Sequence, residues 1–166
     1  GAQDFLFATY QFDGTSSGED VKFTTLSIDY NFGGTDTYLT GCQLLDGSTA
    51  LNTGSNVVNP DPTSTGDAVT FTLDSAGLLI LKGTVKNVNL KCDVSSAVTA
   101  SDTFSWDIDN AQTGSGATSG ATVSVTGTGS GATMTGATAG TLVVALDSSS
   151  PAYKMAPANA TGVLAG

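Results

Sequence analysis

The sequence predicts an all-β fold, an Ig-like antiparallel β-sandwich of roughly eight to ten strands. Short runs of alternating apolar and polar residues recur along the chain, and no window sustains the apolar repeat of about 3.6 residues that marks a helix. Thr is abundant and 21 of the 166 residues are Gly, which suits short strands joined by tight turns. This length is about that of one domain, so residues 1–166 are expected to form a single sandwich.

The first expected strand, residues 1–12, is apolar on both faces. Simple alternation places Phe5 and Phe7 on one face and Leu6, Tyr10 and Phe12 on the other. A strand with two apolar faces needs partners on both sides. It is predicted either to lie between its own sheet and a covering loop or to pack against a neighbouring subunit.

The next strand signals follow between Asp20 and Phe32, where the apolar phase shifts by one residue at Thr24-Thr25. Such a shift is typical of a β-bulge. Further half-buried strands are expected at residues 38–46, 68–73, 84–94 and 103–109. The residues between 46 and 66 include Asn59-Pro60-Asp61-Pro62 and are expected to form a long surface excursion.

Cys42 and Cys92 both fall on the inward phase of their strands. They lie 50 positions apart and are the only cysteines of the chain. A structural disulfide is predicted, provided that their Cα atoms lie within about 7 Å. The alternative is a pair of buried thiols that pack as small apolar side chains.

The second half of the chain is rich in small residues. Trp106 is expected to anchor the core, whereas stacking on a sugar would require it to be exposed. Residues 112–140 are predicted to form one or two strands of Gly, Ser, Thr and Ala. Clear alternation returns between Gly140 and Leu146, with Leu142, Val144 and Leu146 in one phase.

The C-terminal residues 150–166 are expected to be an extended tail, because prolines recur in them and they end in a small apolar patch at Val163 and Leu164. With the N-terminal strand of residues 1–12, this tail is a candidate inter-subunit element. It would lie along the sheet edge of the next molecule, as in donor-strand complementation. The alternative is a frayed linker.

The charge of the chain argues against several classes of partner. The formal net charge is −10, and all five basic residues are Lys. An acidic chain repels nucleic acid and anionic lipid surfaces, so neither is an expected partner. No apolar run is long enough to insert into a membrane. No charged and apolar leader begins at Gly1, so either a signal peptide has been removed or the chain is a segment of a longer one.

The composition disfavours enzymatic chemistry. The chain has no His and a single Glu, Glu19, so it lacks the residues of nucleophilic triads and most zinc sites. No cofactor is expected apart from possible calcium, for which Asp107, Asp109 and Asn110 are weak candidates, as are Asp61 and Asp67. A Lys-Asn cross-link would need Lys22 or Lys86 to be buried. Asn159 begins a glycosylation sequon, Asn159-Ala160-Thr161.

Three short stretches resemble a known class of module: Ser17 to Lys22, Leu26-Ser27-Ile28 and Val88 to Val94. They are similar to the Ig-like repeat modules of surface proteins from candidate-phyla (CPR-type) bacteria, over most of residues 3–165. The resemblance implies a structural role at the cell surface and no catalytic residues. It also implies that a tail such as residues 149–166 runs directly into a strand such as Phe5 to Phe12. The two cysteines depart from that pattern.

These observations predict a non-enzymatic protein that is secreted and lies outside the cell or on its surface. The expected function is that of a structural subunit of a filament or surface layer, in which copies of the chain join head to tail through their terminal strands. The alternative is a monomeric stalk or adhesin module that binds a glycan or a host protein.

Overall fold

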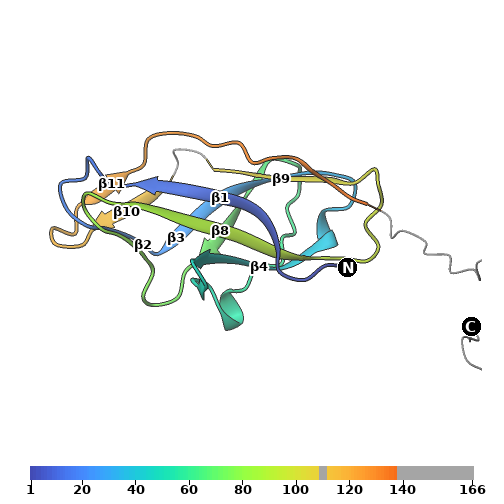
Figure 1. The fold of residues 1–166 in the computed structure, drawn as a ribbon, viewed down its shortest axis with the longest axis horizontal. Coiled ribbons are helices and arrows are strands. Elements are labelled where there is room, and N and C mark those ends of the chain that lie inside the picture. The colour runs from blue at the N-terminus through green and yellow to red at the C-terminus, as the bar shows by residue number, and fades with distance from the viewer. Residues whose placement is uncertain (109–111, 138–166) are drawn as a thin grey trace, which may run out of the picture.

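The computed structural model describes residues 1–108 and 112–137, and within these ranges the chain is built from short strands and two single-turn 3-10 helices (Figure 1). The helices are η1 (Asp36–Tyr38) and η2 (Gly54–Asn56). The strands of the described residues are β1 (Phe5–Asp13), β2 (Val21–Phe23), β3 (Thr25–Gly33), β4 (Leu39–Asp46), β5 (Thr49–Ala50), β6 (Asp67–Thr72), β7 (Leu78–Ile80), β8 (Val85–Val94), β9 (Thr103–Asp107), β10 (Thr113–Gly116), β11 (Thr122–Ser124) and β12 (Met134–Thr135). No helix of these residues has the length and apolarity needed to cross a membrane.

The strands form two layers. One layer is an antiparallel sheet with the order β1-β8-β4-β5. The other consists of two antiparallel sheets, β11-β10-β2-β7 and β12-β9-β3-β6. Consecutive strands of the chain occupy matching places in these two sheets, so they continue one another end to end. The predicted all-β sandwich is confirmed.

The long strand that contains β2 and β3 is interrupted at Thr24. Val21 and Phe23 are buried before this point, and Leu26 and Ile28 are buried after it. The predicted shift of the apolar phase by one residue is therefore present, and it lies where the chain passes from the β11-β10-β2-β7 sheet to the β12-β9-β3-β6 sheet.

Cys42 and Cys92 form a disulfide between the neighbouring strands β4 and β8, with 4.1 Å between their Cα atoms. The register of the two strands shifts between Thr40 and Gln43, beside the bond. Both cysteines are buried. The predicted disulfide is confirmed, and it is a cross-strand bond within one layer.

Aromatic side chains fill the core between the layers. Trp106 is 1% exposed and stacks on Tyr30, with 4.4 Å between ring centroids. Phe71 and Phe104 pack around this pair. The prediction that Trp106 anchors the core is correct, and its burial contradicts the alternative of sugar stacking.

The excursion between residues 46 and 66 is held to the core more firmly than its sequence predicts. Asn52 is fully buried, and its side-chain oxygen accepts a hydrogen bond of 2.7 Å from the Leu44 amide. Its side-chain nitrogen donates to the backbone oxygens of Cys42 and Asn56. The sequence predicts a surface excursion throughout, whereas the bonds of the buried Asn52 side chain to Leu44 and Cys42 anchor the segment to β4.

Candidate functional site

The described surface has a groove along β1. Here β1 is the edge of its sheet: it pairs with β8, and no other described strand pairs with its second edge. Across the sandwich, residues 122–137 form the edge of the other layer. We call the space between β1 and residues 123–132 the long groove, and its volume is about 940 Å³.

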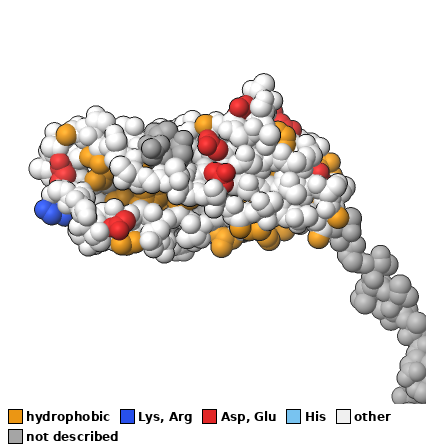
Figure 2. Space-filling model, turned by 90° about the horizontal axis from the view of Figure 1, so that it is seen from above, with side chains coloured by type: hydrophobic (Ala, Val, Ile, Leu, Met, Phe, Trp, Pro, Cys, Tyr) orange, Lys and Arg blue, Asp and Glu red, His pale blue; other side chains and the backbone are white. Residues whose placement is uncertain are grey.

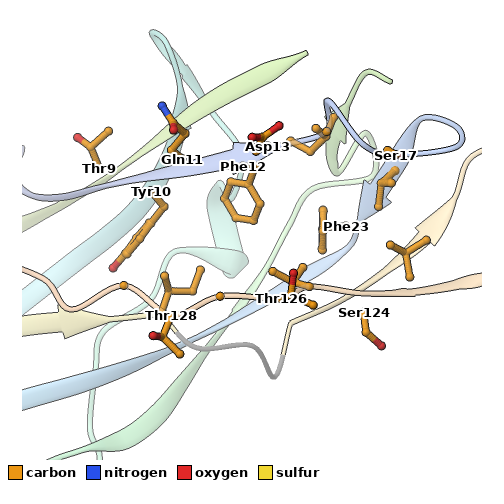
Figure 3. A pocket seen from close by; sticks show the side chains of 18 of the residues that line it. Thr9, Tyr10, Gln11, Phe12, Asp13, Ser17, Phe23, Ser124, Thr126 and Thr128 are labelled. Carbon is orange, nitrogen blue, oxygen red and sulfur yellow. The ribbon is translucent and has the colours of Figure 1, made fainter. Parts of the chain in front are cut away.

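Aromatic side chains form the floor of the long groove. Tyr10 and Phe12 point from β1 into the groove, whereas Thr9, Gln11 and Asp13 point away from it (Figure 3). In the space-filling view, apolar side chains are visible at the bottom of a furrow (Figure 2). The groove is therefore suited to apolar side chains and less to a charged ligand.

Small residues form the opposite wall. Gly129 exchanges backbone hydrogen bonds of 2.7 and 2.8 Å with Ile108, and the Gly131 amide donates to the Asp107 carboxylate at 2.7 Å. A Cβ atom on Gly131 would lie 2.3 Å from the Trp106 backbone oxygen. Glycine is therefore required for this segment to lie so close to β9.

A second hollow, of about 460 Å³, lies at the N-terminal end of β1. We call it the N-terminal hollow. Its lining includes Phe5, Phe7, Val98, Met134 and Ala137. Phe7 lines both hollows, so they lie along one side of the sandwich.

The exposed large apolar side chains of the described residues gather at opposite ends of the β1–β8 pair. Phe5 and Leu6 are 42% and 46% exposed and define the first patch. We define the second patch by Leu79 of β7, Leu81 in the turn after β7 and Val85 at the start of β8, so its members come from both layers. The strand register pairs Phe5 with Cys92 and Asp13 with Val85, so the patches are separated by the length of β1.

The predicted assembly residues divide into three groups. Phe5 and Leu6 are exposed, as a contact with another subunit requires. Phe7, Tyr10 and Phe12 are buried within the molecule. Val163 and Leu164 lie outside the described residues, as does Asn159.

The predicted division of β1 into two apolar faces was wrong. The register with β8 shifts between Leu6 and Ala8, so Phe7 joins Tyr10 and Phe12 on the inward face. Simple alternation cannot find such a bulge, because apolar residues stand on both sides of it.

The predicted calcium ligands are only partly described. Asp109 and Asn110 lie outside the described residues. The carboxylate of Asp107 accepts hydrogen bonds from the Asn31 side chain at 2.9 Å and from the Gly131 amide at 2.7 Å. Asp67 likewise accepts from the Ser64 amide at 2.8 Å. In residues 1–108 and 112–137 no three His, Cys, Asp or Glu side chains cluster as metal ligands.

Neither lysine considered for a Lys-Asn cross-link is buried. Lys86 is half-buried, and its Nζ atom lies 2.6 Å from an Asp46 carboxylate oxygen. Lys22 Nζ donates to the Ser75 backbone oxygen at 3.3 Å. The condition for the cross-link is therefore not met at these lysines.

Glu19 lines the long groove. Its carboxylate accepts hydrogen bonds from the Ser119 hydroxyl group and from the Ser119 and Thr118 amides. These bonds, led by that of the Ser119 side chain, lower the pKa of Glu19. The single Glu of the chain thus holds the turn between β10 and β11.

Comparisons with protein-family models, with curated proteins and with solved structures found no match.

Proposed function

We propose that the protein is a non-enzymatic structural subunit of an extracellular filament or surface layer, in which copies join head to tail. The observation that carries this proposal is the placement of two exposed apolar patches at opposite ends of the β1–β8 pair. A contact between unlike patches leaves one of each free on every growing chain. Such a contact therefore propagates, whereas a patch that met its own copy would stop at a dimer.

Charged residues lie around both patches. Asp4 and Asp93 lie beside the first patch, where the Asp4 amide donates to the Asp93 carboxylate at 2.9 Å. Lys82 follows Leu81 in the second patch. Lys91 pairs with Leu6 at the first patch, and Asp13 pairs with Val85 at the second. The Asp20 carboxylate also accepts a hydrogen bond from the Lys82 amide. Both ends therefore carry charges of both signs, and the apolar contact carries the proposal.

The terminal elements fit this arrangement. The first patch belongs to the N-terminal strand, and the N-terminal hollow beside it offers apolar space. We assign Val163 and Leu164 of the neighbouring copy's tail to this hollow, where they would pack as apolar side chains beside Phe5. The disulfide is compatible with a location outside the cell.

The first test compares substitutions at the two patches. The double variants Phe5→Asp/Leu6→Asp and Leu81→Asp/Val85→Asp should each abolish the fibres or sheets that the unmodified chain forms, as seen by electron microscopy. Thr70→Asp is the matched control, because Thr70 is exposed in β6, paired with Ser27 and away from both patches. It adds a charge and should leave assembly unchanged.

Mixing the two double variants tests the polarity of the contact. Each variant keeps one intact end, so an equimolar mixture should stop at dimers in analytical ultracentrifugation, while each variant alone stays monomeric. Removal of residues 151–166 should also prevent assembly. Native material that consists of uniform monomers, unaffected by any of these changes, would refute the proposal and favour a single binding module of a stalk or adhesin.

A further inference from the structure

Within residues 1–108 and 112–137, the second edge of β1 has no partner strand, so one side of the described sandwich is incomplete. An unpaired edge presents a row of backbone N–H and C=O groups, and proteins commonly cover or pair such edges. Here the edge borders the long groove, whose floor is apolar. A strand with one apolar face would satisfy both features at once: its backbone would pair with β1 and its side chains would fill the groove.

The course of the described chain brings its end to the start of this edge. Residues 122–137 run along the second layer in the direction opposite to β1 (Figure 1). Met134 pairs with Phe104, whose ring lies 6.4 Å from that of Phe7. Ala137 then lines the N-terminal hollow beside Phe5. The chain therefore reaches the N-terminal end of β1 with three residues, 138–140, to go before Thr141.

The sequence that follows has the pattern of the missing strand. Leu142, Val144 and Leu146 alternate with Val143, Ala145 and Asp147. Seven residues of strand span about 23 Å, which fits along the roughly 30 Å of β1. A connection of three residues is within the range of hairpin loops, about two to five residues. A return strand after Ala137 would run antiparallel to residues 122–137 and hence parallel to β1.

We infer that residues 141–147 bind in the long groove of their own molecule, as a strand parallel to β1 that places Leu142, Val144 and Leu146 over Tyr10 and Phe12. The short connection favours the same molecule over a neighbouring copy, because it keeps the strand at a high effective concentration beside its groove. This binding of residues 141–147 to β1 takes place within one molecule and does not require copies to assemble.

Pairing of residues 141–147 with β1 would also determine where the tail of residues 148–166 leaves the sandwich. A strand that starts beside Phe5 and runs parallel to β1 ends near Asp13, at the end that carries Leu81 and Val85. Residues 148–166 then leave the sandwich at the end opposite to the first patch. From there the tail extends toward the first patch of the next copy in a head-to-tail chain.

Hydrogen exchange of the full, monomeric chain tests the inference directly. The Leu81→Asp/Val85→Asp variant is suitable if the unmodified chain polymerises. We expect amides of residues 142–146, and the β1 amides that do not bond to β8, to exchange at least about tenfold more slowly than in an unpaired edge. The protection should not depend on protein concentration.

Val143 and Val144 are neighbours in the sequence, so substitution of one provides a matched control for substitution of the other. Val144→Asp places a charge in the groove, and should abolish this protection and lower the melting temperature by about 5 °C. Val143→Asp adds the same charge to the outer face and should change neither. Fast exchange of residues 142–146 in the unmodified monomer would overturn the inference, as would equal effects of the two variants. Protection that appears only in oligomers would overturn it in favour of a strand from a neighbouring copy.

Discussion

The hydroxyl group of Tyr10, in β1, donates a hydrogen bond to the backbone oxygen of Trp106, in β9, with 3.2 Å between the two oxygens. This bond joins the two layers at the floor of the long groove. Burial, followed by the nearby charge of Asp107, raises the pKa of Tyr10 well above its usual value. Burial and Asp36 raise the pKa of Tyr30 in the same direction.

These raised pKa values predict alkaline destabilisation. The unfolded chain loses its tyrosine protons near pH 10, about the ordinary pKa of Tyr, whereas the folded chain keeps those of Tyr10 and Tyr30. The stabilisation is therefore complete below about pH 10 and is lost as the pH rises toward the folded-state pKa values. Urea unfolding between pH 7 and about pH 11 measures this decline.

The variant Tyr10→Phe measures how much the hydroxyl group of Tyr10 contributes to the free energy of unfolding and to its decline at alkaline pH. We expect it to lower the free energy of unfolding by about 1 kcal/mol at pH 7, because the hydrogen bond to Trp106 is lost. It should also make the alkaline decline shallower. Tyr38→Phe, which removes a phenol elsewhere, is the control. An alkaline decline of unchanged steepness in Tyr10→Phe would show that Tyr10 does not hold its proton in the folded state.

The disulfide between Cys42 and Cys92 predicts a large loss of stability on its removal. The bond closes a loop with a sequence separation of 50 residues, and loop entropy assigns it about 4 kcal/mol. The double variant Cys42→Ala/Cys92→Ala should lose about this much in denaturant unfolding. The unmodified chain in a strong reductant is the comparison, and it should show a similar loss. A loss below about 1 kcal/mol would contradict the prediction.

Much of the fold can be predicted from the sequence where burial follows alternation. Val88, Leu90 and Cys92 alternate in β8 and are all buried, which is why the disulfide could be anticipated from phase alone. The two layers and their strand order could not be predicted in this way. They depend on pairings between distant segments, such as that of β1 with β8, which leave no local pattern.

Asn52 illustrates a core residue that sequence patterns miss, and it yields a further prediction. Asn52→Ala removes three hydrogen bonds and leaves the Leu44 amide and two backbone oxygens without this partner. We expect a loss of about 2–4 kcal/mol in the free energy of unfolding. Asn87→Ala is the matched control, since Asn87 is exposed on β8, and should cost less than about 0.5 kcal/mol. Equal effects of the two variants would mean that Asn52 does not anchor the excursion.

The candidate site was predictable only in part. The apolar character of Phe5 and Leu6 marks the N-terminal strand as a candidate contact, but the bulge beside Phe7 determines which side chains face the groove. The sequence of the groove wall, residues 123–132, indicates its structural role less clearly. Its glycines and threonines look like a flexible tract, and only the close approach of Gly131 to Trp106 explains why small residues are needed there.

The charge of the chain predicts how salt affects assembly. Copies with a formal net charge of −10 repel one another, and salt screens this repulsion, with a Debye length that falls from about 30 Å at 0.01 M to about 8 Å at 0.15 M. Apolar contacts between the patches are not weakened by screening. Light scattering should therefore show faster and more extensive assembly as NaCl rises over this range, while Leu81→Asp/Val85→Asp stays monomeric throughout. Assembly that is strongest at the lowest salt would instead identify ion pairs, such as Lys82 with Asp4 of the next copy, as the main contact.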